Sequence, residues 1–380
     1  MLFGLDAIPL TEPRTGVGHY TLELARALCG EAPGDTFELA YPARYPEIDL
    51  AEGGRALPPN LSLARVPVGP LGRRWWAAGL PRYAARRRFD LFHGTNFEAP
   101  LWGAAARVVT VHDLSLLLLP ETHEPRRVGR ARRRLPLMAR AADAVVTPTE
   151  AVRREACEHL GLPPAKVFAV PEAARECFRP AAPAETEEAR RRLGAGAEFV
   201  LAVGTVEPRK NLPALLTAFE EVASAPRAGD LRLVVAGRRG WLDADFFARL
   251  NRSPARERIV FTGYVTDADL RALYSSCKVF VYPSRYEGFG LPPLEAMSCG
   301  APVIAGRSAA VAEVTAGAAR LFDPDRPEEL TRTLLELLSD EGARRRYAEA
   351  GLRRAAEFSW ARTARLTLGV YREAMERRRQ

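Results

Sequence analysis

The sequence predicts an α/β protein with two Rossmann-like domains, each built on a parallel sheet. Short, continuous apolar runs alternate with helical stretches throughout the chain, as in parallel strands that helices cover on both faces. The length of 380 residues exceeds what one hydrophobic core comfortably supports. A segment at 180–196 contains prolines, a charged run and small residues, which is typical of a linker between two domains.

The first series of runs predicts an N-terminal domain over residues 1–180. Its expected strands are 1–8, 37–42, 61–68, 89–94, 106–113 and 142–149. Its expected helices are 15–30, which a glycine loop opens, and segments near 76–88, 126–141 and 149–161. Strands and helices therefore alternate as they do in a Rossmann-like domain.

The second series predicts a C-terminal domain over residues 197–358. Its expected strands are 199–204, 231–237, 258–263, 278–283, 301–306 and 319–323. Its expected helices lie near 211–224, 243–251, 267–276, 292–299, 308–316 and 327–338. After this sheet is complete, residues 359–380 have the pattern of a long amphipathic helix.

The composition is that of an ordinary globular protein, with 47% apolar and 27% charged residues and a net charge of +8. No apolar run approaches the ~20 residues of a membrane-spanning helix. Residues 1–10 lack the basic region and cleavage site of a signal peptide, so we expect a cytoplasmic protein. The five cysteines have neither the spacing of a zinc site nor that of a disulfide framework.

The most informative segment is 283–302, PSRYEGFGLPPLEAMSCGAP. Glu287 falls on a predicted strand-to-helix loop, and Glu295 falls inside the helix about two turns later. A loop containing Gly288 and Gly290 that opens a helix offers backbone N–H groups to an anion. Carboxylates at this place would instead accept hydrogen bonds from hydroxyls, such as those of a sugar or ribose.

A second motif, VGTVEPRKNL at 203–212, also follows a strand and opens a helix. Arg209 and Lys210 are adjacent cations at a helix N-terminus, where the helix dipole disfavours positive charge. This local conflict indicates a strongly anionic ligand. Lys210 is one of only three lysines in the sequence, and its compact charge suits a phosphate.

The N-terminal domain has weaker candidates. Gly16 and Gly18 lie between the first strand and the first helix, but Thr21 replaces the third glycine of a dinucleotide-binding fingerprint. His112 ends a predicted strand, where α/β sheets bind ligands. His93 also ends a strand, and a place in the cleft and a structural role are equally consistent with its position.

These motifs resemble those of the retaining glycosyltransferases of family 4, and in particular its bacterial mannosyltransferases. The resemblance rests on the E-x7-E of Glu287 and Glu295 and on Arg209 and Lys210 within V-G-x-x-x-x-R-K-N. It spans most of the chain and is densest in 198–330. It implies the GT-B fold, in which an N-terminal acceptor domain and a C-terminal nucleotide-sugar donor domain face each other across a cleft and the last helix crosses back to the N-terminal domain.

The resemblance also implies residue roles. Glu287 and His112 would contact the donor hexose, Glu295 the ribose, and Arg209 and Lys210 the diphosphate. The other expected donor-binding positions are Gly16, Gly204, Tyr264, Val265, Gly288, Phe289, Gly290 and Leu291. A further acidic position of the family corresponds to Glu313, to which we assign no role.

The activity implied is transfer of a hexose from a nucleotide diphosphate sugar to an acceptor hydroxyl, with retention at the anomeric carbon. The leaving phosphate would itself accept the proton of the acceptor. The sequence D-A-D at 243–245 falls at the start of an expected helix, so we expect neither a metal nor another cofactor. Family frequency and the EPRKN sequence favour GDP-mannose as donor, with UDP-glucose next.

The acceptor would be a saccharide or lipid-linked saccharide of cell-surface glycan synthesis. Segments 72–88 and 124–140 are rich in arginine, and the first also carries Trp75, Trp76 and Tyr83. This mixture suits an anionic membrane surface, nucleic acid or ordinary solvated helix faces. Within the resembling family we expect peripheral contact with the inner face of the plasma membrane and no nucleic acid.

Three other classes remain open at this point. A GT-B epimerase or phosphorylase would share the fold, although a phosphorylase needs a cofactor lysine and lysines are few. A Rossmann oxidoreductase is disfavoured by the absent third glycine. A non-catalytic nucleotide-binding protein is disfavoured because all four charged motif residues are present.

Overall fold

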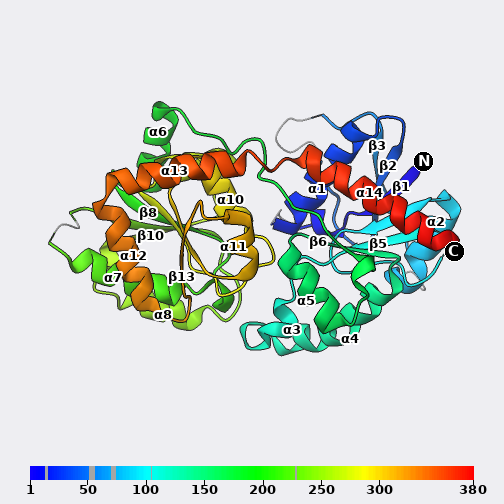
Figure 1. Cartoon of the computed structure of the whole chain (residues 1–380), viewed down its shortest axis with the longest axis horizontal. Coiled ribbons are helices and arrows are strands. Elements are labelled where there is room, and N and C mark those ends of the chain that lie inside the picture. Colours follow the sequence, from blue (N-terminus) through cyan, green and yellow to red (C-terminus); the bar gives the residue numbers. More distant parts are fainter. Residues whose placement is uncertain (13–15, 51–55, 70–73, 104, 227–228) are drawn as a thin grey trace. The chain divides into compact units, whose positions relative to one another are not determined.

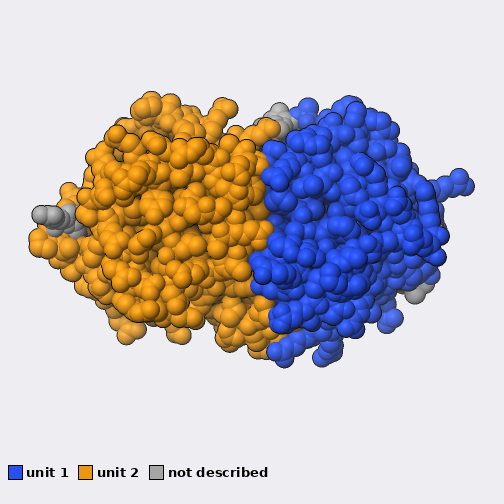
Figure 2. All heavy atoms as spheres, viewed as in Figure 1, with its two compact units in different colours: residues 1–114, 129–173, 359–380 blue, residues 115–128, 174–358 orange. Residues whose placement is uncertain are grey.

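The computed structural model describes residues 1–380 except 13–15, 51–55, 70–73, 104 and 227–228. The described residues form two compact units, shown in blue and orange in Figure 2. Unit 1 comprises residues 1–114, 129–173 and 359–380, and unit 2 comprises residues 115–128 and 174–358.

Unit 1 contains a seven-stranded sheet in the order β3-β2-β1-β4-β5-β6-β7 (Figure 1). Its strands are β1 (Leu2–Asp6), β2 (Thr36–Pro42), β3 (Leu61–Val66), β4 (Leu91–Gly94), β5 (Ala106–Thr110), β6 (Ala144–Thr147) and β7 (Val167–Ala169). All the pairings between these strands are parallel. The strand order reverses between β1 and β4, so the carboxyl ends of these two strands flank a crevice where α/β sheets bind ligands.

The main helices of unit 1 surround this sheet. They are α1 (Gly16–Glu31), α2 (Leu80–Arg87), α4 (Pro125–Ala141), whose first turn belongs to unit 2, α5 (Glu150–Leu160) and α14 (Trp360–Arg379). A π-helical turn, Trp75–Gly79, precedes α2. The C-terminal helix α14 packs beside α1 (Figure 1), and Ser359 caps it by accepting a hydrogen bond from Arg362 N–H.

His93 of β4 is a core residue of unit 1. Its Nδ1 lies 2.8 Å from the hydroxyl of Tyr371 on α14, and its Nε2 lies 2.8 Å from Thr110 Oγ1 on β5. Burial lowers the pKa of His93 to about 3, so the ring is neutral. The sequence left open whether His93 lies in the cleft or in the core, and the structure shows that it lies in the core.

Unit 2 contains a six-stranded sheet in the order β10-β9-β8-β11-β12-β13. Its strands are β8 (Phe199–Val203), β9 (Arg232–Ala236), β10 (Ile259–Gly263), β11 (Val279–Tyr282), β12 (Val303–Gly306) and β13 (Arg320–Phe322). These pairings are also parallel. The order reverses between β8 and β11, which again creates a crevice at the carboxyl edge of the sheet.

Helices cover both faces of this second sheet. They are α6 (Pro183–Leu193), α7 (Leu212–Ser224), α8 (Ala244–Asn251), α9 (Asp267–Ser276), α10 (Leu291–Ser298), α11 (Ala309–Thr315), α12 (Pro327–Ser339) and α13 (Glu341–Ala355). Unit 2 also includes the short helix α3 (Ser115–Leu118). Phe199 and Leu201 pack into the apolar cluster that includes Leu294 of α10. Their neighbours Val200 and Ala202 pack into the opposite cluster, as the two-residue period of a strand requires.

The segment 180–196, in which the sequence predicts a linker, contains α6 and belongs to unit 2. Pro183 begins this helix, and the carboxylate of Glu185 accepts a hydrogen bond from the N–H of Ala182 at 2.8 Å. The helix packs against α9. The charged run is therefore the exposed face of a helix, and the contacts divide the chain between residues 173 and 174.

The aromatic part of segment 72–88 does not lie on the surface, contrary to expectation. Trp75 and Trp76 are 1% and 7% exposed and pack with Leu80 and Phe92 in the core of unit 1. Any membrane contact of this segment would therefore depend on its arginines, of which Arg73 lies outside the described residues. Within the described part of the chain, no helix is long and apolar enough to cross a membrane.

We predict that Tyr371→Phe destabilises unit 1 without disturbing its fold. The change removes the hydroxyl that pairs with buried His93 Nδ1, and an unpaired buried polar group costs about 1–3 kcal/mol. The measurement is the urea midpoint of the variant relative to wild type. Tyr264→Phe is the control, because Tyr264 is 58% exposed; equal midpoints for the two variants would show that α14 is not held by this bond.

Candidate functional site

The charged residues of both sequence motifs meet at the carboxyl edge of the unit 2 sheet, between β8 and β11. The loop after β8 carries Arg209 and Lys210, and the loop after β11 carries Glu287. A backbone hydrogen bond from Arg285 N–H to the carbonyl of Arg209, 3.0 Å long, joins the two loops. The site therefore occupies the point of strand reversal where α/β sheets bind ligands.

Glu287 is held between the two cations. Its Oε1 lies 2.7 Å from Lys210 Nζ and its Oε2 lies 2.8 Å from Arg209 Nη1. Arg209 also donates a 2.6 Å hydrogen bond to Glu207, and Lys210 donates one of 2.7 Å to the hydroxyl of Tyr282. The two carboxylates balance the two cations, so this ion cluster (Glu207, Arg209, Lys210 and Glu287) is neutral as a whole.

The environment keeps Glu287 ionised. Burial alone would raise the pKa of Glu287, but the positive charges of Arg209 and Lys210 more than offset this and lower it to about 2. The side chain is only 11% exposed. At neutral pH Glu287 is therefore a pure hydrogen-bond acceptor, which is the chemistry required to hold sugar hydroxyls.

Glu295 lies on α10 in a contrasting environment. Its Oε1 is 3.8 Å from Arg175 Nη2, and the hydroxyl of Tyr274 donates to its Oε2 at 3.4 Å. Burial raises the pKa of Glu295 to about 7, and the nearby Asp267 adds to this while Arg175 opposes it. Glu295 therefore changes its charge near neutral pH, whereas Glu287 does not.

The start of α10 offers few backbone donors. Gly290 caps the helix with φ = 99°, which side chains disfavour. Pro292 and Pro293 have no N–H, and the N–H of Leu294 already bonds to the carbonyl of Gly290 at 3.3 Å. The N–H of Leu291 is thus what the first turn can present to a ligand.

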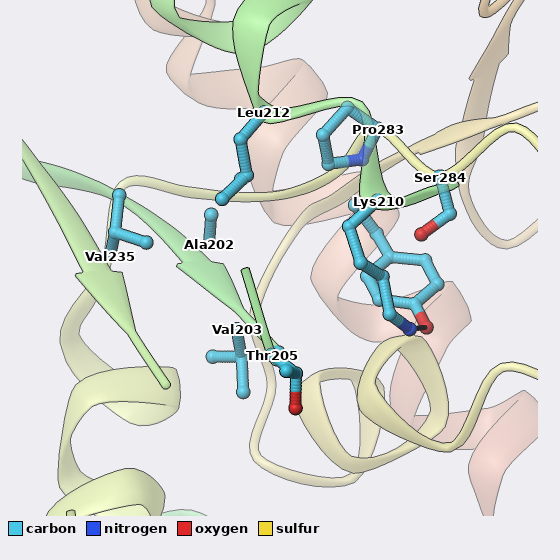
Figure 3. Close-up of a pocket in the computed structure, with 10 residues that line it drawn as sticks. Ala202, Val203, Thr205, Lys210, Leu212, Val235, Pro283 and Ser284 are labelled. Carbon is cyan, nitrogen blue, oxygen red and sulfur yellow. Dashed lines mark hydrogen bonds between the residues drawn. The ribbon is translucent and has the colours of Figure 1, made fainter. Parts of the chain in front are cut away.

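The remaining predicted donor-binding positions of unit 2 differ in their surroundings. Gly204 lines a cavity of about 10 Å³ beside Lys210 and Ser284 (Figure 3), which has room for a single water at most. The side chain of Phe289 packs against Phe358, so only its backbone can serve a ligand.

Tyr264 and Val265 follow β10, two strands away from β8 in the sheet. Tyr264 is exposed with Arg238 over its ring, at 4.8 Å. Val265 packs against the core. The structure places these two residues outside the ion cluster, although at the same edge of the sheet.

In unit 1, His112 is fixed by two acceptors. Its Nε2 lies 2.8 Å from the carbonyl of Thr95, and its Nδ1 lies 3.2 Å from Glu172 Oε1. Burial opposes a charged ring, but Glu172 and the Thr95 carbonyl outweigh it and raise the pKa of His112. Both ring nitrogens thus have an acceptor partner. Gly16 is the exposed first residue of α1, and Thr15 of the same motif lies outside the described residues.

Two residues of the site were missed from the sequence. Glu207 could have been identified, because it lies two positions before Arg209 and supplies its counter-charge. Arg175, which pairs with Glu295 and Asp267, lies in a segment without a recognisable motif. Among the residues that the structure describes, no group of three His, Cys, Asp or Glu side chains could hold a metal, and Asp243 of the D-A-D sequence pairs with Arg239 at 3.0 Å.

Known proteins resemble this chain over nearly its whole length. The family model "Glycosyltransferase Family 4" matches residues 14–173, and "Glycosyl transferases group 1" matches residues 184–354. The O-antigen chain mannosyltransferase B of Escherichia coli is 31% identical over 373 residues, covering 96% of this chain and 97% of the relative. The D-inositol 3-phosphate glycosyltransferase of Kineococcus radiotolerans is 32% identical over 417 residues, covering 99% and 95%.

Solved structures share the fold. HepE from Anabaena, crystallised with UDP and glucose, has a TM-score of 0.75 at 19% identity, covering 97% of this chain and 98% of that chain. WaaG, a glycosyltransferase involved in lipopolysaccharide biosynthesis, has a TM-score of 0.74 at 18% identity, covering 97% and 98%. The two Rossmann-like units of this chain thus have the architecture of GT-B glycosyltransferases.

We predict that Glu295→Gln stabilises the protein at pH 8 but not at pH 4. The folded-state pKa of about 7 lies above the ordinary 4.5, so Glu295 favours folding below pH 4.5 and this contribution is lost as the pH rises through 7. Glutamine does not ionise, so the variant keeps this contribution at high pH. The difference in the free energy of unfolding is up to about 3 kcal/mol. Melting temperatures at both pH values test this; a variant that is less stable at pH 8 would contradict the burial argument.

Proposed function

This chain belongs to glycosyltransferase family 4, and we propose that it transfers mannose from GDP-mannose to a glycan acceptor with retention at the anomeric carbon. The observation that supports a nucleotide-sugar donor is the ion cluster at the carboxyl edge of the unit 2 sheet. It combines buried cations, which suit a diphosphate, with a permanently ionised carboxylate, which suits sugar hydroxyls.

In this proposal the donor exchanges partners within the ion cluster. The diphosphate competes with Glu287 for Arg209 and Lys210, which frees the Glu287 carboxylate to accept hydrogen bonds from the hexose. Such an exchange keeps both buried cations paired, and the hexose hydroxyls would supply hydrogen bonds to the released carboxylate; a buried charge left with neither is strongly destabilising. The N–H of Leu291 would serve the phosphate or the sugar, and Glu295 would accept a hydrogen bond from the ribose.

The proposed chemistry needs no enzymic nucleophile. The bond between the anomeric carbon and the diphosphate oxygen breaks, and the acceptor oxygen bonds to the same face of that carbon. The leaving diphosphate oxygen takes the proton of the acceptor hydroxyl. Arg209 and Lys210 would stabilise the charge that grows on the diphosphate, so we propose that no divalent metal is required.

The donor sugar and base are supported by the relatives. The Escherichia coli relative is a mannosyltransferase, which favours mannose. HepE was crystallised with UDP and glucose, which makes UDP-glucose the second candidate. Tyr264 and Val265 would contact the base.

We also propose that α4 contacts an anionic membrane surface during glycan synthesis. Its exposed residues include Arg126, Arg127 and Arg132, and each basic residue near an anionic surface is worth about 1 kcal/mol. Co-sedimentation with phosphatidylglycerol vesicles at low salt tests this. The absence of binding there would remove the membrane from the proposal without affecting the donor site.

We predict that one sugar nucleotide raises the melting temperature in a panel of GDP-mannose, UDP-glucose, UDP-N-acetylglucosamine, ADP-glucose and NAD, with a chelator present throughout. A ligand at 100 times its dissociation constant stabilises the folded state by about 2.7 kcal/mol. Lys210→Ala should abolish the shift, since it removes one of the two cations. Turnover should fall by roughly 10²–10³, as for the loss of one electrostatic donor.

Lys278→Ala is the matched control, because Lys278 pairs with Glu198 away from the ion cluster and should leave the shift intact. NMR of the product formed in chelator then gives the anomeric configuration. An inverted product would refute retention, and turnover only with added metal would refute metal independence. A shift with NAD alone would refute the class of function.

A further inference from the structure

Unit 1 contains a cavity of about 500 Å³ at the point where its own strand order reverses. Asp6, the last residue of β1, lines one side, and Asn96 and Glu98, which follow β4, line another. The volume lies in the range of sites for small ligands. The cavity thus has the same topological position in unit 1 that the ion cluster has in unit 2.

The lining of this cavity is strongly basic. Arg44, Arg74, Arg130 and Arg134 contribute four cations. Glu98 pairs with Arg134 at 2.6 Å. Burial raises the pKa of Asp6 to about 8, so this carboxyl carries a proton at neutral pH. The arginines of the lining therefore outnumber its ionised carboxylates, and the cavity is suited to an anion.

Aromatic side chains line the same cavity. Trp75, Trp76 and Tyr45 contribute to its wall. The two tryptophans are 1% and 7% exposed, whereas Tyr45 is half-buried, so Tyr45 is the aromatic ring of the wall that a sugar ring can contact. Trp75 is 1% exposed, and its indole N–H has no acceptor among the described residues. Because buried polar groups are normally hydrogen-bonded, we expect this N–H to donate a hydrogen bond to an oxygen of the ligand.

The arginines of α4 that line the cavity share one face of the helix. Arg130, Arg134 and Met138 follow at intervals of four residues, which places them above one another on one side. Arg133 belongs to the same helix but is exposed and does not line the cavity. Only part of the basic surface of α4 is therefore directed to this site.

We propose that this cavity binds the acceptor and that the acceptor is a phosphorylated saccharide, with its phosphate at Arg130 and Arg134 and its sugar beside Tyr45. This rests on the proposed function, to which it adds the chemical class of the second substrate. A phosphate offers several acceptor oxygens to converging guanidinium groups. The protonated Asp6 would donate a hydrogen bond to a sugar oxygen.

The test is calorimetric titration of the full chain with mannose 1-phosphate and with methyl α-mannoside. The phosphorylated sugar should bind more tightly. Arg130→Gln should weaken it by about tenfold or more, as expected for one charge-assisted hydrogen bond, while Arg133→Gln should not. Glu98→Gln should tighten binding, because it releases Arg134 and removes a negative charge; a purely structural role would not produce this gain.

Two further titrations distinguish binding at this cavity from binding at the donor site. Binding of mannose 1-phosphate should persist in Lys210→Ala, which removes a cation of the ion cluster, and GDP-mannose should still bind Arg130→Gln. If the wild type binds a sugar nucleotide but Arg130→Gln and Arg133→Gln bind mannose 1-phosphate equally, the acceptor inference is overturned and the proposed function stands. If no sugar nucleotide binds, the proposed function fails whatever the result at this cavity.

Discussion

The buried contact of Glu287 with Arg209 and Lys210 is the constraint on which the rest of unit 2 depends. It joins the loops after β8 and β11 and holds two adjacent cations at the sheet edge, where Lys210 lines the small cavity beside Gly204. A buried ion pair contributes little net stability, but the loss of one partner leaves an expensive unpaired charge. A ligand that replaces Glu287 as the partner of the cations therefore keeps the cations paired, but it must also offer hydrogen-bond donors to the displaced carboxylate.

The two switch points of the molecule differ in their charge. In unit 2, carboxylates and cations balance, so an entering diphosphate must exchange with a carboxylate. In unit 1, a protonated Asp6 leaves the arginines in excess, so an anion can enter without exchange. Glu287 and Glu295 likewise have pKa values displaced in opposite directions by their surroundings, which is typical of groups with distinct functions.

The fold and the charged motif residues could be predicted from the sequence, because apolar runs mark parallel strands and the motifs follow those strands directly. The linker prediction at 180–196 was wrong because a charged run can equally be the exposed face of a helix such as α6. Trp75 and Trp76 could not be placed, since tertiary packing decides whether an aromatic residue is buried. Arg175 reaches Glu295 from 120 positions earlier in the chain, a contact that local pattern does not reveal.

The most direct test of the account is the affinity of Glu287→Gln for GDP, measured by calorimetry beside wild type. The variant lacks the carboxylate that competes for Arg209 and Lys210, so the account predicts GDP affinity about tenfold higher or more, the equivalent of 1.4 kcal/mol, together with loss of hexose transfer. GDP affinity that is unchanged or weaker in this variant would show that the cations do not exchange Glu287 for a diphosphate, and would contradict the account.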